Sequence, residues 1–212
     1  MPFGVLISGS GTNLQALLDA CAAPGFPAEI AVVVSNRADA FGLERARAAG
    51  VPAIHVPHRG RTRSAFEADL VSVLQDHGVE WVALAGFMRL LTPTFLNAFP
   101  SRVLNVHPAL LPSFPGSDGA GDALAAGVRV AGVTVHVVDE GVDTGPILAQ
   151  GTAPVLPDDD RARLHARLQR LEHRLFPVVM GLVAEGRLRV DGRVVHADLR
   201  AGESLSIMDA TP

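Results

Sequence analysis

The sequence predicts an α/β fold with a largely parallel sheet. In the first half of the 212-residue chain, short apolar runs of strand length alternate with segments of helical apolar spacing, as in successive βαβ units. Hydrophobic residues make up 48% of the chain, enough for a substantial core. The second half adds the alternating run Val130–Val138, which predicts a mixed sheet there.

The first half contains five predicted strands and three predicted helices. The strand over Phe3–Ile7 ends at a Gly-rich loop, and the helix over Asn13–Cys21 follows it. Gly50 and Gly78 each follow a further predicted helix, in the position that ends many helices. The remaining strands cover Ile30–Val34, Ala53–Val56, Trp81–Ala85 and Val103–Val106, and the remaining helices cover Ala40–Ala49 and Ser64–His77.

In the second half, Ile147–Val155 is expected to pair with Val130–Val138, and a long helix follows, capped by Asp158 or Asp159. Asp191-Gly192 separates two short segments, 187–190 and 193–196, and predicts a hairpin. Together these elements predict a Rossmann-like, three-layer fold. We expect one domain over 1–200, with a phosphate-binding half (1–100), a catalytic half (101–200) and a flexible tail (201–212).

Composition excludes several classes of protein. All 18 basic residues are arginines and tyrosine is absent, which excludes lysine Schiff-base chemistry, the P-loop lysine and Tyr/Lys dehydrogenases. A single cysteine, Cys21, excludes an intrachain disulfide and a cysteine-clustered zinc site. No histidine pair has metal-ligand spacing, so we expect no metal.

The net charge is −4 with no dense basic run, which argues against nucleic-acid binding. No run approaches the roughly 20 apolar residues of a membrane span. The N-terminus does not resemble a signal peptide. We therefore expect a cytoplasmic protein.

The stretch ISGSGTN lies where a strand meets a helix. Gly9 and Gly11 allow close backbone approach, and the helix N-terminus attracts anions. A dinucleotide fingerprint would need a third glycine where Leu14 stands, so one terminal phosphate is the better prediction. The alternative is an ordinary tight turn.

Asn105 and His107 occupy alternate positions at the end of a predicted strand, followed by three prolines in LNVHPALLPSFPG. Alternation puts both side chains on one face, and the carboxyl ends of such strands are where ligands bind. An amide and an imidazole together can stabilise an oxyanion and exchange protons. A buried pair satisfied by loop carbonyls is equally compatible with this position.

Other candidates are weaker on their own. Asp143 in DEGVDTGPI could orient a histidine, although an ordinary turn aspartate is the simpler reading. The run GFMRLL (86–91) could wall a slot for a flat ring or could be core. Glu172 lies beside the apolar stripe of the long helix. It either faces a ligand amine or simply lies at the edge of that stripe.

Taken together, six segments resemble the phosphoribosylglycinamide formyltransferases, enzymes of purine synthesis that use 10-formyltetrahydrofolate. These segments are ISGSGTNLQALLDA, SNRADAFGLERARAAG, LAGFMRLL, LNVHPALLPSFPG, TVHVVDEGVDTGPI and LEHRLFP, and the resemblance runs from about Val5 to Gly186. It implies formyl transfer to glycinamide ribonucleotide, with the formylated folate as co-substrate, no metal, and a monomer or homodimer acting on small molecules.

The resemblance also implies roles for individual residues. The catalytic residues would be Asn105, His107 and Asp143. The nucleotide substrate would contact Gly11, Thr12, Asn13, Gln169, Arg170, Leu171 and Glu172. The folate would contact Arg63, Met88, Arg89, Leu90, Leu91, Asn105, Asp139, Glu140, Gly141, Val142 and Asp143.

One loop departs from the family pattern. After LLPSFPG the family usually has a histidine-containing stretch and often a lysine at the position of Ser113, whereas this chain reads SDGAGDAL, with Asp118, Gly119 and Gly121. The glycines predict a mobile loop, and the missing histidine and lysine predict an altered substrate affinity.

Three alternatives share parts of these motifs. A methionyl-tRNA formyltransferase is expected to carry a basic C-terminal extension, and a formyltetrahydrofolate hydrolase an extra N-terminal domain. A non-catalytic phosphate-binding module would need only the Gly-rich loop.

Overall fold

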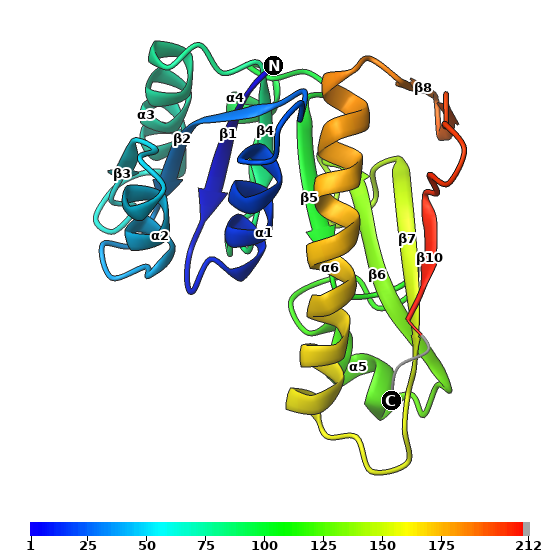
Figure 1. Cartoon of the computed structure of the whole chain (residues 1–212). Helices are drawn as coiled ribbons and strands as arrows, with labels where there is room; N and C mark the ends of the chain where they lie inside the picture. The colour runs from blue at the N-terminus through cyan, green and yellow to red at the C-terminus, as the bar shows by residue number, and fades with distance from the viewer. Residues whose placement is uncertain (210–212) are drawn as a thin grey trace. The chain divides into compact units, whose positions relative to one another are not determined.

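The computed structural model describes residues 1–209, which form two compact units that divide between Asn105 and Val106. The boundary falls inside one strand. Each unit has its own sheet region and its own helices (Figure 1).

The first unit contains a parallel sheet with the order β3-β2-β1-β4-β5. Its strands are β1 (Pro2–Ile7), β2 (Glu29–Ser35), β3 (Ala53–His55), β4 (Trp81–Leu84) and β5 (Val103–His107), of which the last continues into the second unit. Its helices are α1 (Thr12–Cys21), α2 (Gly42–Ala48), α3 (Arg63–Asp76) and α4 (Pro93–Leu96).

The chain order of this sheet reverses between β1 and β4. From β1 the chain runs outward through β2 to β3, then returns to β4 and β5 on the other side. Helical connections between parallel strands cover such a sheet on both faces, which then needs apolar residues on both. Phe3, Val5, Leu6 and Ile7 of β1 are accordingly all fully buried. Ligands bind at such a reversal, outside the carboxyl ends of the strands.

The second unit is built on an antiparallel pair, β6 (Val130–Val137) and β7 (Ile147–Pro154), with β10 (Ser206–Met208) parallel to β7. The long helix α6 (Arg161–Ala184) lies along β6 and β7 (Figure 1). The short helix α5 (Gly119–Ala125) contacts α6. A separate hairpin of β8 (Leu188–Asp191) and β9 (Val194–Ala197) turns at Gly192, whose φ is 59°.

The α/β class is confirmed, with a parallel first half and antiparallel strands later. The predicted cap of the long helix is wrong by one or two residues, because Asp160 is the N-cap. Asp159 instead accepts hydrogen bonds of 2.6 and 3.0 Å from the buried Arg167 guanidinium. The segment expected as a flexible tail contains β10, and residues 210–212 lie outside the described part.

Candidate active site

The Gly-rich loop joins β1 to α1. Gly11 is the N-cap of α1 in the left-handed conformation (φ 72°, ψ 34°), and no N-cap side chain satisfies the helix N-terminus. A Cβ on Gly11 would lie 2.7 Å from the Gly42 Cα, so only glycine fits against α2. The predicted phosphate residues Thr12 and Asn13 begin the helix. A helix terminus without a capping side chain, approached through glycine, is suited to an anion.

The apolar segment 86–91 lies directly beside this loop. The Ser8 amide donates to the Gly86 carbonyl (3.0 Å), and the Ser8 hydroxyl accepts from the Met88 amide (2.9 Å). Phe87 is buried, whereas Met88 and Leu90 are 72% and 57% exposed. The loops after β1 and β4 therefore meet at the point where the strand order reverses, and present two large apolar side chains to solvent there.

Helix α3 contacts this segment and the residue that follows it. The Glu67 carboxylate, 1% exposed, accepts a 3.0 Å hydrogen bond from the Thr92 amide and a second one from the Thr92 hydroxyl. The Arg89 guanidinium lies over the Phe66 ring of this helix, 5.1 Å from the ring centroid. Arg63, the first residue of α3, is exposed. Sequence reasoning missed Glu67, although a carboxylate next to the apolar positions of a helix is the signal that could have found it.

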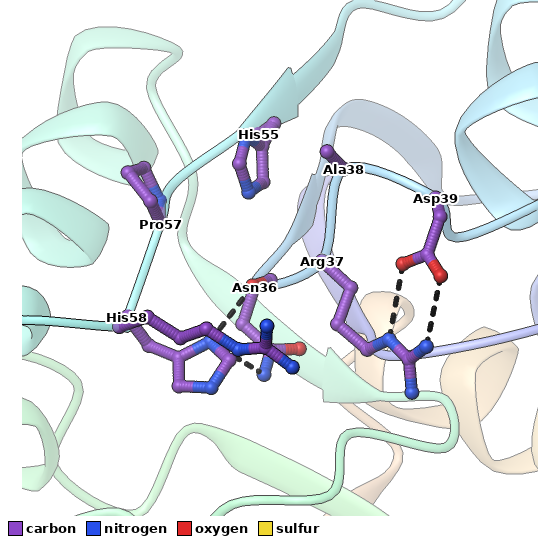
Figure 2. Close-up of a pocket in the computed structure, with 8 residues that line it drawn as sticks. Asn36, Arg37, Ala38, Asp39, His55, Pro57 and His58 are labelled. Carbon is purple, nitrogen blue, oxygen red and sulfur yellow. Dashed lines mark hydrogen bonds and ion pairs between the residues drawn. The ribbon is translucent and has the colours of Figure 1, made fainter.

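A pocket of about 300 Å³ opens at the carboxyl ends of β2 and β3 (Figure 2). Within it, His58 Nδ1 lies 2.8 Å from the Asn36 carbonyl oxygen, and Arg37 pairs with Asp39 through two hydrogen bonds. Asn36 Oδ1 accepts from the Ser8 hydroxyl at 2.7 Å. Asn36 of the pocket lining is thus hydrogen-bonded to Ser8, and Ser8 is hydrogen-bonded to the first residues of segment 86–91. The lining residues are Asn36, Arg37, Ala38, Asp39, His55, Pro57, His58 and Arg59.

In the second unit, two buried histidines flank Asp143. His107 Nδ1 lies 3.6 Å from Asp143 Oδ2, and His136 Nε2 lies 3.5 Å from Asp143 Oδ1. The side chains of His107 and His136 are 4% and 2% exposed, that of Asp143 13%. The predicted neighbours His107 and Asp143 are thus brought together from β5 and the loop after β6. Asn105 precedes His107 by two residues in β5, opposite Leu84 of β4.

Both nitrogens of His107 face acceptors. Nε2 lies 2.8 Å from the Phe114 carbonyl oxygen, while Nδ1 faces the Asp143 carboxylate. His136 repeats the arrangement, with Nδ1 3.0 Å from the Val137 carbonyl oxygen and Nε2 facing the same carboxylate. A neutral imidazole carries only one N–H. Each ring therefore faces two acceptors, and in its neutral form it can donate to one of them at a time.

The surroundings of Asp143 favour its ionised form. Burial alone would raise the pKa of this carboxyl, but hydrogen bonds from His136 and the Gly116 amide, together with the charges of His107 and His136, lower it below its ordinary value. The Gly116 amide donates to Oδ2 at 2.8 Å. The site thus pairs a carboxylate with imidazoles that can carry positive charge.

The backbone around Asp143 is held in a tight loop. Asp143 itself has φ 54°, a conformation uncommon for a residue with a side chain. The Asp139 carboxylate accepts from the Gly141 amide (3.1 Å) and the Thr144 hydroxyl (2.7 Å). A Cβ on Gly145 would lie 1.8 Å from the Val137 carbonyl oxygen, so glycine is required. Of the loop expected to meet folate, Glu140, Gly141 and Val142 are exposed, whereas Asp139 shapes the turn.

The four predicted substrate residues of α6 lie on different faces of the helix. Leu171 is fully buried in the core, and Arg170 pairs with Asp209 at 3.4 Å. Glu172 is 3% exposed and Gln169 is half-buried. Glu172 and Gln169 therefore stay as the candidates of this segment for a substrate contact.

His136 is the other residue that sequence reasoning missed. It appeared only as a member of the alternating strand Val130–Val138, in which a buried histidine among valines is the signal. No group of three or more metal-ligating side chains that could hold an ion occurs within residues 1–209. None of the helices in that same range combines the length and apolar character of a membrane span.

Comparison with known proteins identifies relatives over most of the chain. A family described as formyl transferase matches residues 1–180. The phosphoribosylglycinamide formyltransferase of Escherichia coli (strain K12) is 42% identical over 196 residues, 92% of each chain. The crystal structure of glycinamide ribonucleotide transformylase 1 from Symbiobacterium toebii superposes with a TM-score of 0.91 at 52% identity, over 93% of each chain.

Some relatives are much longer proteins. The trifunctional purine biosynthetic protein adenosine-3 of Drosophila pseudoobscura pseudoobscura is 47% identical over 188 residues, which are 87% of this chain and 14% of the relative. The chain thus spans about one seventh of the length of such relatives. With the family match covering residues 1–180 and the E. coli relative matched almost end to end, the chain belongs to the formyl transferase family.

Proposed function

We propose that this chain is a phosphoribosylglycinamide formyltransferase. It transfers the formyl group of 10-formyltetrahydrofolate to the amine of 5-phosphoribosylglycinamide in purine biosynthesis, and releases tetrahydrofolate. The observation that carries the proposal is the buried His107–Asp143 pair, 3.6 Å apart at the end of β5, in a chain 42% identical to the E. coli enzyme of this name. A cytoplasmic location and a monomeric or dimeric state remain predictions from the sequence.

Substrate binding in this proposal uses the loops after β1 and β4 and helix α6. The N-terminus of α1, with Gly11, Thr12 and Asn13, receives the phosphate. The exposed Met88 and Leu90 offer apolar surface to the folate rings. The further folate contacts are Arg63, Arg89, Leu91 and the loop 139–143, and the glycinamide contacts are Gln169 and Glu172.

In the reaction, Asn105 and His107 stabilise the negative charge that develops on the formyl oxygen as the substrate amine attacks the formyl carbon. Donors aimed at such an oxygen are worth roughly 3–4 kcal/mol each. Asp143 orients His107 and compensates its positive charge. The contact of His107 Nε2 with the Phe114 carbonyl would keep this N–H directed until the formyl oxygen competes for it.

The reaction requires the transfer of one proton from the substrate amine to the folate nitrogen. A carbon–nitrogen bond forms to the substrate amine, which loses a proton, and the bond from the formyl carbon to the folate nitrogen breaks, with that nitrogen gaining a proton. His107 is the side chain placed to relay it, directly or through water. Holding both substrates against one set of groups supplies the proximity contribution.

The test follows deformylation of 10-formyltetrahydrofolate spectrophotometrically, with and without glycinamide ribonucleotide. Turnover that requires the ribonucleotide is the expected result, with N-formylglycinamide ribonucleotide as product. Equal turnover in its absence would identify a hydrolase instead. Binding of both ligands without turnover would contradict the assignment of Asn105, His107 and Asp143.

A further inference from the structure

Arg45 on α2 is an arginine that reaches across to the Gly-rich loop. Its Nε–H donates to the Ser10 carbonyl at 2.9 Å, and its Nη1–H donates to the Gln15 side-chain oxygen at 3.1 Å. Its guanidinium lies 5.0 Å from the centroid of the Phe41 ring. One side chain therefore ties the loop before α1 to the first turn of α1.

The hydrogen bond to Ser10 sets the direction of the next amide. A trans peptide is planar, with its C=O and N–H pointing in opposite directions. Because the Ser10 carbonyl points to Arg45, the Gly11 N–H points away from Arg45. Gly11 has a left-handed backbone (φ 72°), and two further contacts hold this geometry: the Gly42 amide donates to the Gly9 carbonyl at 3.1 Å, and the Gly11 Cα packs against Gly42.

The charge of Arg45 is also uncompensated. Within residues 1–209 no carboxylate lies within ion-pair distance of its guanidinium, whereas Arg47 on the same helix pairs with Glu44 at 2.5 Å. Arg45 is only half-exposed, and a partly buried charge is less screened by salt than an exposed one. In a chain without lysine, such a cation beside the loop is available to a phosphate dianion.

We propose that Arg45 is a positioning residue of the phosphate site: it fixes the Ser10–Gly11 peptide and places an unpaired positive charge beside the loop, so that the enzyme discriminates for the phosphorylated substrate. The inference rests on the proposed function and extends it to a residue outside the Gly-rich loop and α1. Arg45 acts on the phosphate indirectly, through the orientation of the loop amides and through the electrostatic attraction of its positive charge.

The experiment compares two substrates, glycinamide ribonucleotide and the corresponding nucleoside without the phosphate. In Arg45→Ala, kcat/KM for the ribonucleotide is expected to fall roughly ten- to hundredfold, mainly through KM, because the Ser10–Gly11 peptide loses its anchor and the loop loses a nearby positive charge. For the nucleoside, kcat/KM should stay within about twofold of wild type, as expected for an interaction that involves only the phosphate. KM for 10-formyltetrahydrofolate should not change.

Arg47→Ala is the matched control, because it removes an exposed arginine from the same helix and should leave both substrates unaffected. Arg45→Lys keeps the charge but lacks the planar guanidinium with its two donor directions, so kcat/KM for the ribonucleotide should fall less than in Arg45→Ala. An equal fall for both substrates in Arg45→Ala would show a general structural role and overturn the proposal. No fall for either substrate would also overturn it.

A binding measurement separates this inference from the proposed function. Calorimetric titration with ribose 5-phosphate, and with ribose as the reference, reports the phosphate site without any formyl transfer. Weaker binding of ribose 5-phosphate in Arg45→Ala but not in Arg47→Ala would support the inference even for a protein that transfers no formyl group. Unchanged binding in Arg45→Ala would refute it whatever the turnover, and thermal melting of each variant verifies folding.

Discussion

At the scale of single residues, Asp143 concentrates the chemistry of the second unit. The Asp143 carboxylate faces His107 through one oxygen and His136 through the other. It also accepts a hydrogen bond from the Gly116 amide. A group that orients one imidazole is expected to matter through its charge as well as its shape. The second histidine gives the carboxylate a fixed orientation of its own.

Replacing this carboxylate should therefore abolish most of the activity. In Asp143→Asn we expect kcat to fall by roughly 10³- to 10⁴-fold, as for loss of the carboxylate in a comparable His–Asp pair. Asp143→Ala and His107→Ala should lose turnover by orders of magnitude while the fold survives. Steady-state rates and circular-dichroism melts of each variant provide the measurement.

The exposed Asp158 offers a control in the same unit, since Asp158→Asn removes a surface carboxylate that pairs with Arg163. Near-normal turnover in Asp143→Asn or His107→Ala would rule out the proposed catalytic group.

At the scale of elements, the segment 86–91 is held at both ends by groups of the first unit. Ser8 holds Met88 at its start, and the buried Glu67 holds Thr92 just after its end. The apolar side chains between these anchors can then stay exposed without the segment collapsing onto the core. The affinity for folate should depend on both anchors.

Removal of the second anchor should affect one substrate selectively. Glu67→Ala leaves the Thr92 amide without its acceptor, so we expect the free energy of unfolding to fall by about 1–3 kcal/mol. The KM for 10-formyltetrahydrofolate should rise severalfold, and the KM for glycinamide ribonucleotide should not. Asp69→Ala, which removes an exposed carboxylate from the same helix, should change neither KM. A rise of both KM values in Glu67→Ala would contradict this assignment.

Helix α5 accounts for the loop that departs from the family pattern. Asp118 is its N-cap, accepting from the Gly121 amide at 3.1 Å, and also pairs with Arg161 of α6 at 2.7 Å. Gly119 is required because a Cβ there would lie 2.6 Å from the Pro108 carbonyl oxygen. The glycines that predicted mobility instead allow a capped helix to pack closely beside residues 108–109.

Asp118 should accordingly contribute to stability more than to chemistry. In Asp118→Ala the lost cap should lower the free energy of unfolding by about 1 kcal/mol, because the exposed pair with Arg161 adds little. Turnover should stay within about twofold of wild type. Denaturant unfolding and steady-state rates test both parts, and a large loss of kcat with unchanged stability would place Asp118 in the reaction instead.

At the scale of the whole molecule, stability should depend on pH at both extremes. Hydrogen bonds from Arg187 lower the pKa of Glu203 from 4.5 to about 2. Burial, and then the charge of Glu29, raise the pKa of Cys21 from 9.0 to about 11. A carboxyl whose pKa is lowered by folding stabilises the fold above pH 4.5, and this stabilisation is lost as the pH falls toward 2. A thiol whose pKa is raised by folding stabilises the fold below pH 9, and this stabilisation is lost as the pH rises toward 11.

The free energy of unfolding, measured in denaturant between pH 2 and 11, should therefore fall below pH 4.5 and again above pH 9. In Cys21→Ser the alkaline fall should become shallower, because the hydroxyl does not ionise in this range. In Glu203→Gln the acid fall should become shallower. An alkaline slope identical in wild type and Cys21→Ser would show that burial of the thiol does not contribute.

The sequence by itself determined the elements and their class. Strands and helices follow from local apolar spacing, which is why the five strands and the three longer helices of the first half were found within one or two residues of their ends. The four-residue helix α4 is too short to show such spacing and was not predicted. Gly11 and the alternate placement of Asn105 and His107 are equally local features. The wrong prediction at α6 concerns which of several nearby aspartates caps the helix. At α5, the glycines led us to expect a mobile loop where a short helix begins.

Only the tertiary structure decided how distant polar groups meet. The pairing of Thr92 with Glu67 spans 25 residues, and that of Gly116 with Asp143 spans 27. No periodicity in the sequence links such positions, because the contacts exist only once strands and helices have packed. The same packing turns His136 toward Asp143 and Arg45 toward Ser10. Periodicity along the chain therefore reveals the scaffold and candidate residues, while their partners are set by burial, which leaves each polar group only a few acceptors within reach.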